Sequence, residues 1–144
     1  HLTTLNVPMN QLTAVDISQN TMLTRLDVSN NNIQSLSVDA NTELVSLWCF
    51  NNQITTLDLA TNSVLKFLNC SGNQLTELDI SANTQLTRLL VYNNQLTELD
   101  ISKNPLLSRL WAFGNPLADT EAENIISTLK SAPNGDLWLT EDPS

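Results

Sequence analysis

Apolar residues recur along the chain in one pattern, L-x-x-L-x-L-x-x-N, in which Ile, Val, Cys or Ala can replace Leu. The spacing between units alternates between ten and eleven residues, so the full repeat is a pair of half-units 21 residues long. The units begin at Leu2, Leu12, Leu23, Ile33, Leu44, Ile54, Leu65, Leu75, Leu86, Leu96 and Leu107. A fixed period of this length predicts a solenoid, in which each turn buries its apolar residues against its neighbours.

The L-x-L segment of each half-unit alternates between apolar and other residues, as a strand does when one of its faces is buried. Both half-units carry this alternation. We therefore expect a mainly β repeat solenoid with parallel strands in both half-repeats, arranged as two sheets packed back to back. Successive turns, which we call rungs, should then stack at about 4.8 Å.

Every unit ends in an asparagine. An Asn at each chain reversal predicts a buried ladder of side chains that hydrogen-bond the backbone of the turns. The ladder residues are Asn10, Asn20, Asn31, Asn41, Asn52, Asn62, Asn73, Asn83, Asn94, Asn104 and Asn115.

The repeat pattern predicts a division of the chain into repeats over residues 1–116 and a C-terminal cap over 117–144. Thr120 and Glu123 are spaced as a capping box, which predicts a helix over about 120–131, followed by a final strand over about 136–140. Four apolar residues at helical spacing form one stripe: Ala122, Ile125, Ile126 and Leu129. No cap precedes Leu2 and the chain opens in mid-pattern, so we interpret it as a fragment of a larger protein.

The phrases LVSLWCFNNQITTLDLATNSVLKFLNCSGNQ and LTELDISANTQLTRLLVYNNQ resemble the 21-residue leucine-rich repeats of internalin J-like proteins. They are equally similar to repeats of surface proteins from Bacteroidetes, whose cap the C-terminal segment also resembles. The resemblance covers about residues 2–115. It implies a leucine-rich-repeat fold and a secreted or cell-surface bacterial module for adhesion and recognition, without enzymatic activity. Internalin J-like repeats carry a ladder of inward cysteines, whereas that column retains only Cys49 and Cys70 here.

The two outward faces differ chemically. The half-units that begin at Leu12, Ile33, Ile54, Leu75 and Leu96 present Asp16, Asp58, Asp79 and Asp100 and no aromatic residue. All the aromatic and Arg residues fall in the outward columns of the other half-units. Trp, Tyr and Arg supply much of the binding energy of protein interfaces, which predicts a binding surface on this face. Its residues are Trp48, Phe50, Phe67, Arg88, Leu90, Tyr92, Arg109, Trp111, Phe113 and Trp138.

Several interpretations of this aromatic face stay open. The leading hypothesis is recognition of a protein partner. The same Trp residues could instead stack on a carbohydrate, or the face could close by self-association. The domain could also be a structural spacer, in which the rings only strengthen the sheet by stacking between rungs.

The remaining chemistry is sparse. Fifteen acidic and six basic residues give a net charge of −9, which disfavours binding to nucleic acid or anionic membranes. The only His is His1, and the repeats never lengthen to enclose a pocket, so we expect no catalysis, cofactor or zinc site. The aspartate column could bind calcium, but solvated carboxylates are the simpler interpretation. Cys49 and Cys70 should be buried free thiols, because neighbouring parallel strands rarely meet disulfide geometry.

Overall fold

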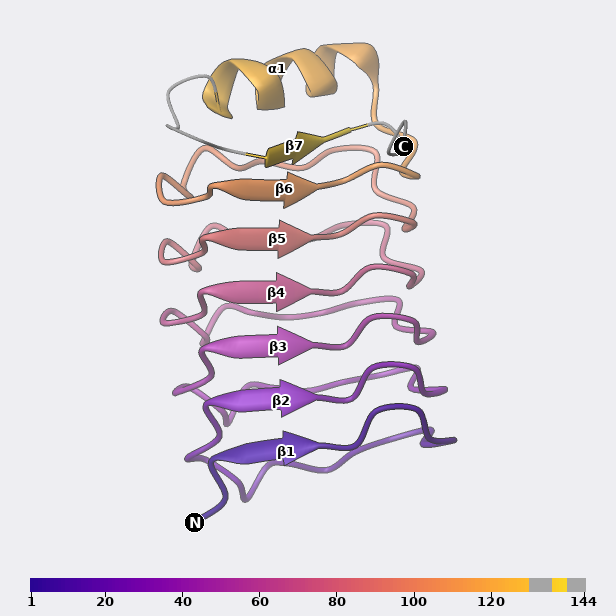
Figure 1. Ribbon diagram of the computed structural model, residues 1–144, viewed down its shortest axis with the longest axis vertical. Coiled ribbons are helices and arrows are strands. Elements are labelled where there is room, and N and C mark those ends of the chain that lie inside the picture. Colours follow the sequence, from indigo (N-terminus) through magenta and orange to yellow (C-terminus); the bar gives the residue numbers. More distant parts are fainter. Residues whose placement is uncertain (130–135, 140–144) are drawn as a thin grey trace.

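The computed structural model describes residues 1–129 and 136–139, and these form a solenoid with a helix over its C-terminal end (Figure 1). Seven parallel strands make one sheet in chain order, and the helix α1, Asp119–Leu129, lies between the last two strands in sequence. The strands are β1 (Thr4–Asn6), β2 (Arg25–Asp27), β3 (Ser46–Trp48), β4 (Phe67–Asn69), β5 (Arg88–Leu90), β6 (Arg109–Trp111) and β7 (Asp136–Trp138). The predicted repeat solenoid, capping helix and final strand are confirmed.

The register of the sheet follows the 21-residue period. Leu26 pairs with Leu47 and Leu47 with Leu68, so equivalent residues of successive rungs lie side by side. Leu110 of β6 pairs with Leu137 of β7, so the sequence offset between these two strands is longer than one repeat. The extra length is due to α1, which is inserted between them. Each outward column of the sequence is therefore a row of neighbouring side chains.

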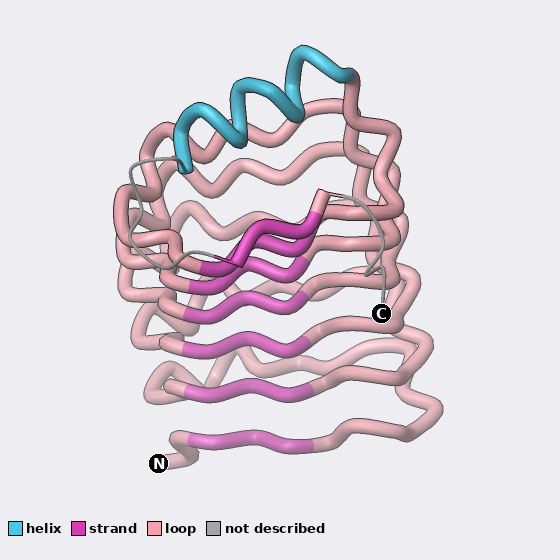
Figure 2. Tube along the Cα trace, turned by 45° about the horizontal axis from the view of Figure 1, so that its top comes forward, coloured by secondary structure: helices cyan, strands magenta, loops and turns pink. Residues whose placement is uncertain are grey.

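The expectation of two sheets is wrong for the described residues, because strands form in only one half-unit of each repeat. Figure 2 shows strands along one wall of the coil and loop segments along the other. In the second half-unit the carboxylate of Asp79 accepts a hydrogen bond from the backbone N of Ser81, and Asp100 does the same for Ser102. Equivalent bonds, from Ser29 N to Asp27 and from Ser71 N to Asn69, accompany strands β2 and β4, so these bonds do not by themselves prevent a strand. One backbone bond per rung remains at the start of this half-unit, as from Gln74 to Ile54.

The core fills the space between the two walls. Leu26, Leu47, Leu68 and Leu89 are fully buried at the centre of their strands. Leu5, the equivalent residue of β1, is only half-buried because a rung covers it on one side alone. The buried leucines are thus stabilised mainly by their neighbours in adjacent rungs.

The asparagine ladder is confirmed for the column Asn31, Asn52, Asn73, Asn94 and Asn115. Within it, Asn52 accepts a hydrogen bond from Ile33 N through Oδ1 and donates from Nδ2 to the carbonyl oxygens of Val28 and Cys49. A second column of asparagines, at the opposite corner of the coil, donates hydrogen bonds to backbone carbonyl groups. Asn83 donates from Nδ2 to Leu59 O and Asn62 O, so the side chains of this column satisfy backbone carbonyl acceptors.

The capping helix begins at Asp119, one residue before the predicted start at about residue 120. The carbonyl oxygen of Ala118 accepts hydrogen bonds from the backbone N of both Glu121 and Ala122, which starts α1 at Asp119. Ile125 is buried against the last rung, whereas Ile126 is exposed and leaves the predicted stripe. The predicted ends of the helix, at residue 131, and of the last strand, at residue 140, lie outside the described residues. No described helix has the length and apolarity needed to cross a membrane.

Candidate binding surface

The outward side chains of the strands, together with those of the second residue after each strand, form one surface that we call the strand face. Trp48 and Trp111 end β3 and β6, and Phe67 begins β4. Arg88 and Leu90 begin and end β5, and Arg109 begins β6. The predicted residues Phe50, Tyr92 and Phe113 follow two residues after β3, β5 and β6.

One group of rings lies over β3 and β4. The centroids of Trp48 and Phe67 are 4.9 Å apart with the ring planes tilted by 38°. The register pairs Trp48 with Asn69 and Ser46 with Phe67, so the two rings meet diagonally across the strands. The guanidinium carbon of Arg25 lies 5.4 Å from the Trp48 ring centroid, within cation–π range.

A second group lies over β5 and β6, and we call Tyr92, Trp111 and Phe113 the C-terminal aromatic cluster. Tyr92 and Phe113 are stacked, with centroids 4.6 Å apart and planes at 11°. The Tyr92 and Trp111 rings are 6.4 Å apart and tilted. Arg109 lies 5.9 Å from the Trp111 ring centroid. The cluster thus joins stacked rings to a cation on adjacent rungs.

Short polar side chains separate the two groups. Asn69 accepts hydrogen bonds through Oδ1 from Ser71 Oγ at 2.6 Å and from Ser71 N at 3.2 Å, and both residues are buried. Leu90 pairs with Asn69 on one side and with Trp111 on the other, so it lies between the polar residues of β4 and the C-terminal aromatic cluster. The backbone of Trp138 pairs with that of Trp111, but the Trp138 side chain lies outside the described part of the structure.

The six described aromatic side chains are half-buried, and five of them contact another ring: Trp48, Phe67, Tyr92, Trp111 and Phe113. The large exposed apolar side chains lie elsewhere. Met22, Val64 and Leu106 occupy equivalent positions in the corner before β2, β4 and β6, and are 49%, 38% and 50% exposed. Sequence reasoning missed this row because these residues fall outside the core pattern; apolar residues in otherwise polar turns were the available signal.

The opposite, acidic face carries the Asp column. Hydrogen bonds from the backbone and side chain of Ser81 lower the pKa of Asp79, and the corresponding bonds from Ser102 lower the pKa of Asp100. The carboxylates are therefore engaged in local turns as well as solvated. Among the described residues, no three or more His, Cys, Asp or Glu side chains are grouped so as to hold a metal ion.

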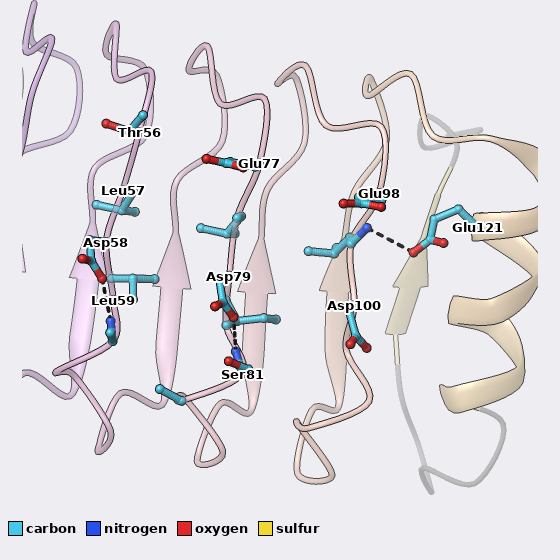
Figure 3. A pocket seen from close by; sticks show the side chains of 15 residues that line it. Thr56, Leu57, Asp58, Leu59, Glu77, Asp79, Ser81, Glu98, Asp100 and Glu121 are labelled. Atoms are coloured by element: carbon cyan, nitrogen blue, oxygen red, sulfur yellow. Dashed lines mark hydrogen bonds between the residues drawn. The ribbon is translucent and has the colours of Figure 1, made fainter.

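The acidic face is not flat, contrary to the expectation that regular repeats leave no pocket. An open groove of about 740 Å³ runs across three rungs, past Asp58, Asp79 and Asp100 (Figure 3). Small side chains such as Ala60 line it, and Glu121 of α1 borders its C-terminal end. Periodicity alone could not reveal this hollow, because the cap supplies one of its walls.

The two cysteines match the expectation of buried free thiols. Cys49 and Cys70 follow paired residues of β3 and β4, and both side chains are fully buried. Burial raises the pKa of Cys70 to about 12 and that of Cys49 well above its usual value. Both thiols are therefore neutral and unreactive in the folded protein.

Comparison with known proteins identifies the family of these repeats. Residues 21–62 match a family described as leucine-rich repeats in two copies, and residues 64–86 match a single leucine-rich repeat. Among curated proteins, no relative matches the sequence significantly.

Solved structures resemble the chain along most of its length. A functional domain of InlJ from Listeria monocytogenes, which includes a cysteine ladder, is 44% identical over 81% of this chain, with a TM-score of 0.80. A leucine-rich-repeat protein of Leptospira interrogans is 31% identical over 94%, with a TM-score of 0.86. A Listeria monocytogenes internalin, InlF, is 27% identical over 97%, with a TM-score of 0.90.

The chain spans 26%, 36% and 42% of these three proteins, respectively. The chain belongs to the leucine-rich-repeat family, and its repeats are of the kind found in bacterial internalin-like proteins.

Proposed function

We propose that this chain is a non-enzymatic binding module of a secreted or cell-surface bacterial protein, and that it recognises a protein partner through the strand face. The observation that carries the proposal is the segregation of rings. All six described aromatic residues lie on the strand face, and none lies on the acidic face of the same coil. A surface that combines aromatic rings with arginine is typical of interface centres.

The arrangement of the rings favours a protein over a carbohydrate partner. Tyr92 stacks on Phe113, and Trp48 contacts Phe67, so each ring already has an aromatic neighbour. A sugar ring would need a free, flat aromatic platform, whereas a protein side chain can pack against the edges and gaps of a cluster. The similarity to internalins supports the same class of function.

The proposal can be tested without knowing the partner. A library of random 12-residue peptides, displayed on phage, is selected on the wild-type protein, and enriched peptides are then synthesised and titrated. The variant Tyr92→Ser/Trp111→Ser/Phe113→Ser should weaken their binding by about tenfold or more. The matched control, Met22→Ser/Val64→Ser/Leu106→Ser, removes three exposed apolar side chains from the corner and should bind normally.

Circular dichroism and thermal unfolding establish that each variant is folded. If the triple aromatic variant unfolds, Tyr92→Ser alone replaces it. Light scattering over a concentration series shows whether the wild type self-associates through the same cluster. Peptides that bind the folded aromatic variant as tightly as the wild type would refute the assignment of this surface.

A further inference from the structure

Basic side chains are concentrated beside the proposed binding surface. The chain has only six Lys and Arg residues and a net charge of −9. Three of the six begin strands on the strand face: Arg25 on β2, Arg88 on β5 and Arg109 on β6. A fourth, Lys66, immediately precedes β4 and is exposed. The strand face thus differs from the whole molecule in charge as well as in aromatic content.

Three of these cations occupy consecutive rungs. Arg88 pairs in register with Arg109, and Arg88 N donates a hydrogen bond to Lys66 O at 3.2 Å. Like charges placed directly opposite each other across strands are unfavourable unless a counter-charge is supplied. Arg88 is exposed, and no described carboxylate forms an ion pair with Arg88 or Lys66. We call Lys66 and Arg88, which lie on neighbouring rungs, the cationic strip.

Acidic residues are scarce on this side. Two carboxylate residues lie in the seven strands, Asp27 on β2 and Asp136 on β7. Asp27 Oδ1 accepts hydrogen bonds from Ser29 N and Ser29 Oγ, and the backbone of Asp136 pairs in register with that of Arg109. The aspartates of the acidic face lie on the other wall of the coil, across the packed core. An approaching ligand therefore meets two exposed cations, Lys66 and Arg88, with which no described carboxylate forms an ion pair.

We propose that the partner of the strand face is an acidic protein segment that also carries aromatic side chains. This inference rests on the proposed function and specifies the chemistry of the partner. Carboxylates of the segment pair with the cationic strip, where the fork of Arg88 can bind a carboxylate through two parallel hydrogen bonds. Its rings pack on the adjacent C-terminal aromatic cluster, in which Trp111 ends β6 and Tyr92 lies four residues beyond Arg88.

The test uses a fluorescent random copolymer of L-glutamate and L-tyrosine as the probe, titrated into the full chain by fluorescence anisotropy. Arg88→Glu should weaken binding by about tenfold, and Lys66→Glu should weaken it in the same direction. The matched control is Lys103→Glu, which makes the same change of charge in a turn of the acidic half-unit and should bind as the wild type does. Added salt should weaken wild-type binding.

The outcomes separate this inference from the proposed function. The inference is overturned if the wild type does not bind the copolymer, or if Arg88→Glu and Lys103→Glu bind it equally. Selected peptides that depend on the aromatic cluster but show no excess of Asp and Glu would also overturn it, while leaving the proposed function standing. Binding that is lost in Arg88→Glu but retained in the triple aromatic variant would support the cationic strip and refute the aromatic surface.

Discussion

The backbone N of Leu99 donates a hydrogen bond of 3.1 Å to Oε1 of Glu121, which joins the last acidic half-unit to the capping helix (Figure 3). Leu99 is buried, and its amide has no further rung beyond it in this half-unit. The carboxylate of α1 thus supplies this amide with a hydrogen-bond acceptor. This contact ties the cap to the solenoid.

Glu121→Ala should lower the free energy of unfolding by about 1–2 kcal/mol, because the buried Leu99 amide loses a charged acceptor. Urea denaturation followed by circular dichroism measures the change. Glu123→Ala is the control, since it removes the same charge from an exposed position of α1. Equal stability of the two variants would show that the contact does not hold the cap.

Asn52→Ala should cost about 1–3 kcal/mol, because it leaves Ile33 N without its acceptor in a dry interior and removes one of the two side-chain donors to the Val28 carbonyl. The exposed Asn10 donates only within its own turn, to Val7 O and Pro8 O, so Asn10→Ala should cost much less. Chemical denaturation compares the two. A loss for Asn52→Ala no greater than that for Asn10→Ala would contradict a stabilising role of the ladder.

Met9 has a backbone φ of 54°, a left-handed conformation that the equivalent positions of later rungs assign to Asn or Gly. Met9→Asn should therefore raise stability by about 1 kcal/mol, because Asn tolerates this conformation better than Met. Met22→Asn is the control, since Met22 is also exposed but has ordinary backbone angles. A melting temperature that rises equally in both variants would point to surface polarity as the cause.

The buried thiols predict a loss of stability in alkali. In the unfolded chain both cysteines ionise near pH 9, whereas in the folded protein burial raises the pKa of Cys70 to about 12 and that of Cys49 in the same direction. Their contribution is therefore complete below pH 9 and is lost as the pH rises toward 12. The variant Cys49→Val/Cys70→Val, which extends the Val28 and Val91 column, should flatten this dependence.

Unfolding free energies measured from pH 7 to pH 10.5 test the alkaline prediction, and titration with a thiol reagent provides a second readout. The native wild type should react slowly and the unfolded chain rapidly. Rapid reaction under native conditions, or an unchanged pH profile in the valine variant, would be inconsistent with buried neutral thiols.

Several features followed from the amino-acid pattern alone. The 21-residue period predicted the solenoid and its inward columns, because each rung repeats the same alternation of buried and exposed positions. The capping helix was predicted from the apolar stripe at helical spacing that follows the last repeat. The period also placed Trp48, Tyr92 and Trp111 on one face. A column at fixed spacing must become a row of neighbours once parallel strands stack in register.

Tertiary structure decided which polar groups meet. Among the described residues the second half-unit forms no strand ladder, even though it has the same alternation as the first, and the carboxylates of Asp79 and Asp100 accept local amides there. Contacts between rungs stack Tyr92 on Phe113 and half-bury both rings, whereas the sequence alone indicated only their shared face. The groove and the Glu121 contact arise where helix and solenoid join. Periodicity reports which side of the chain is buried, but hydrogen-bond partners and ring geometry depend on atoms brought together from different rungs.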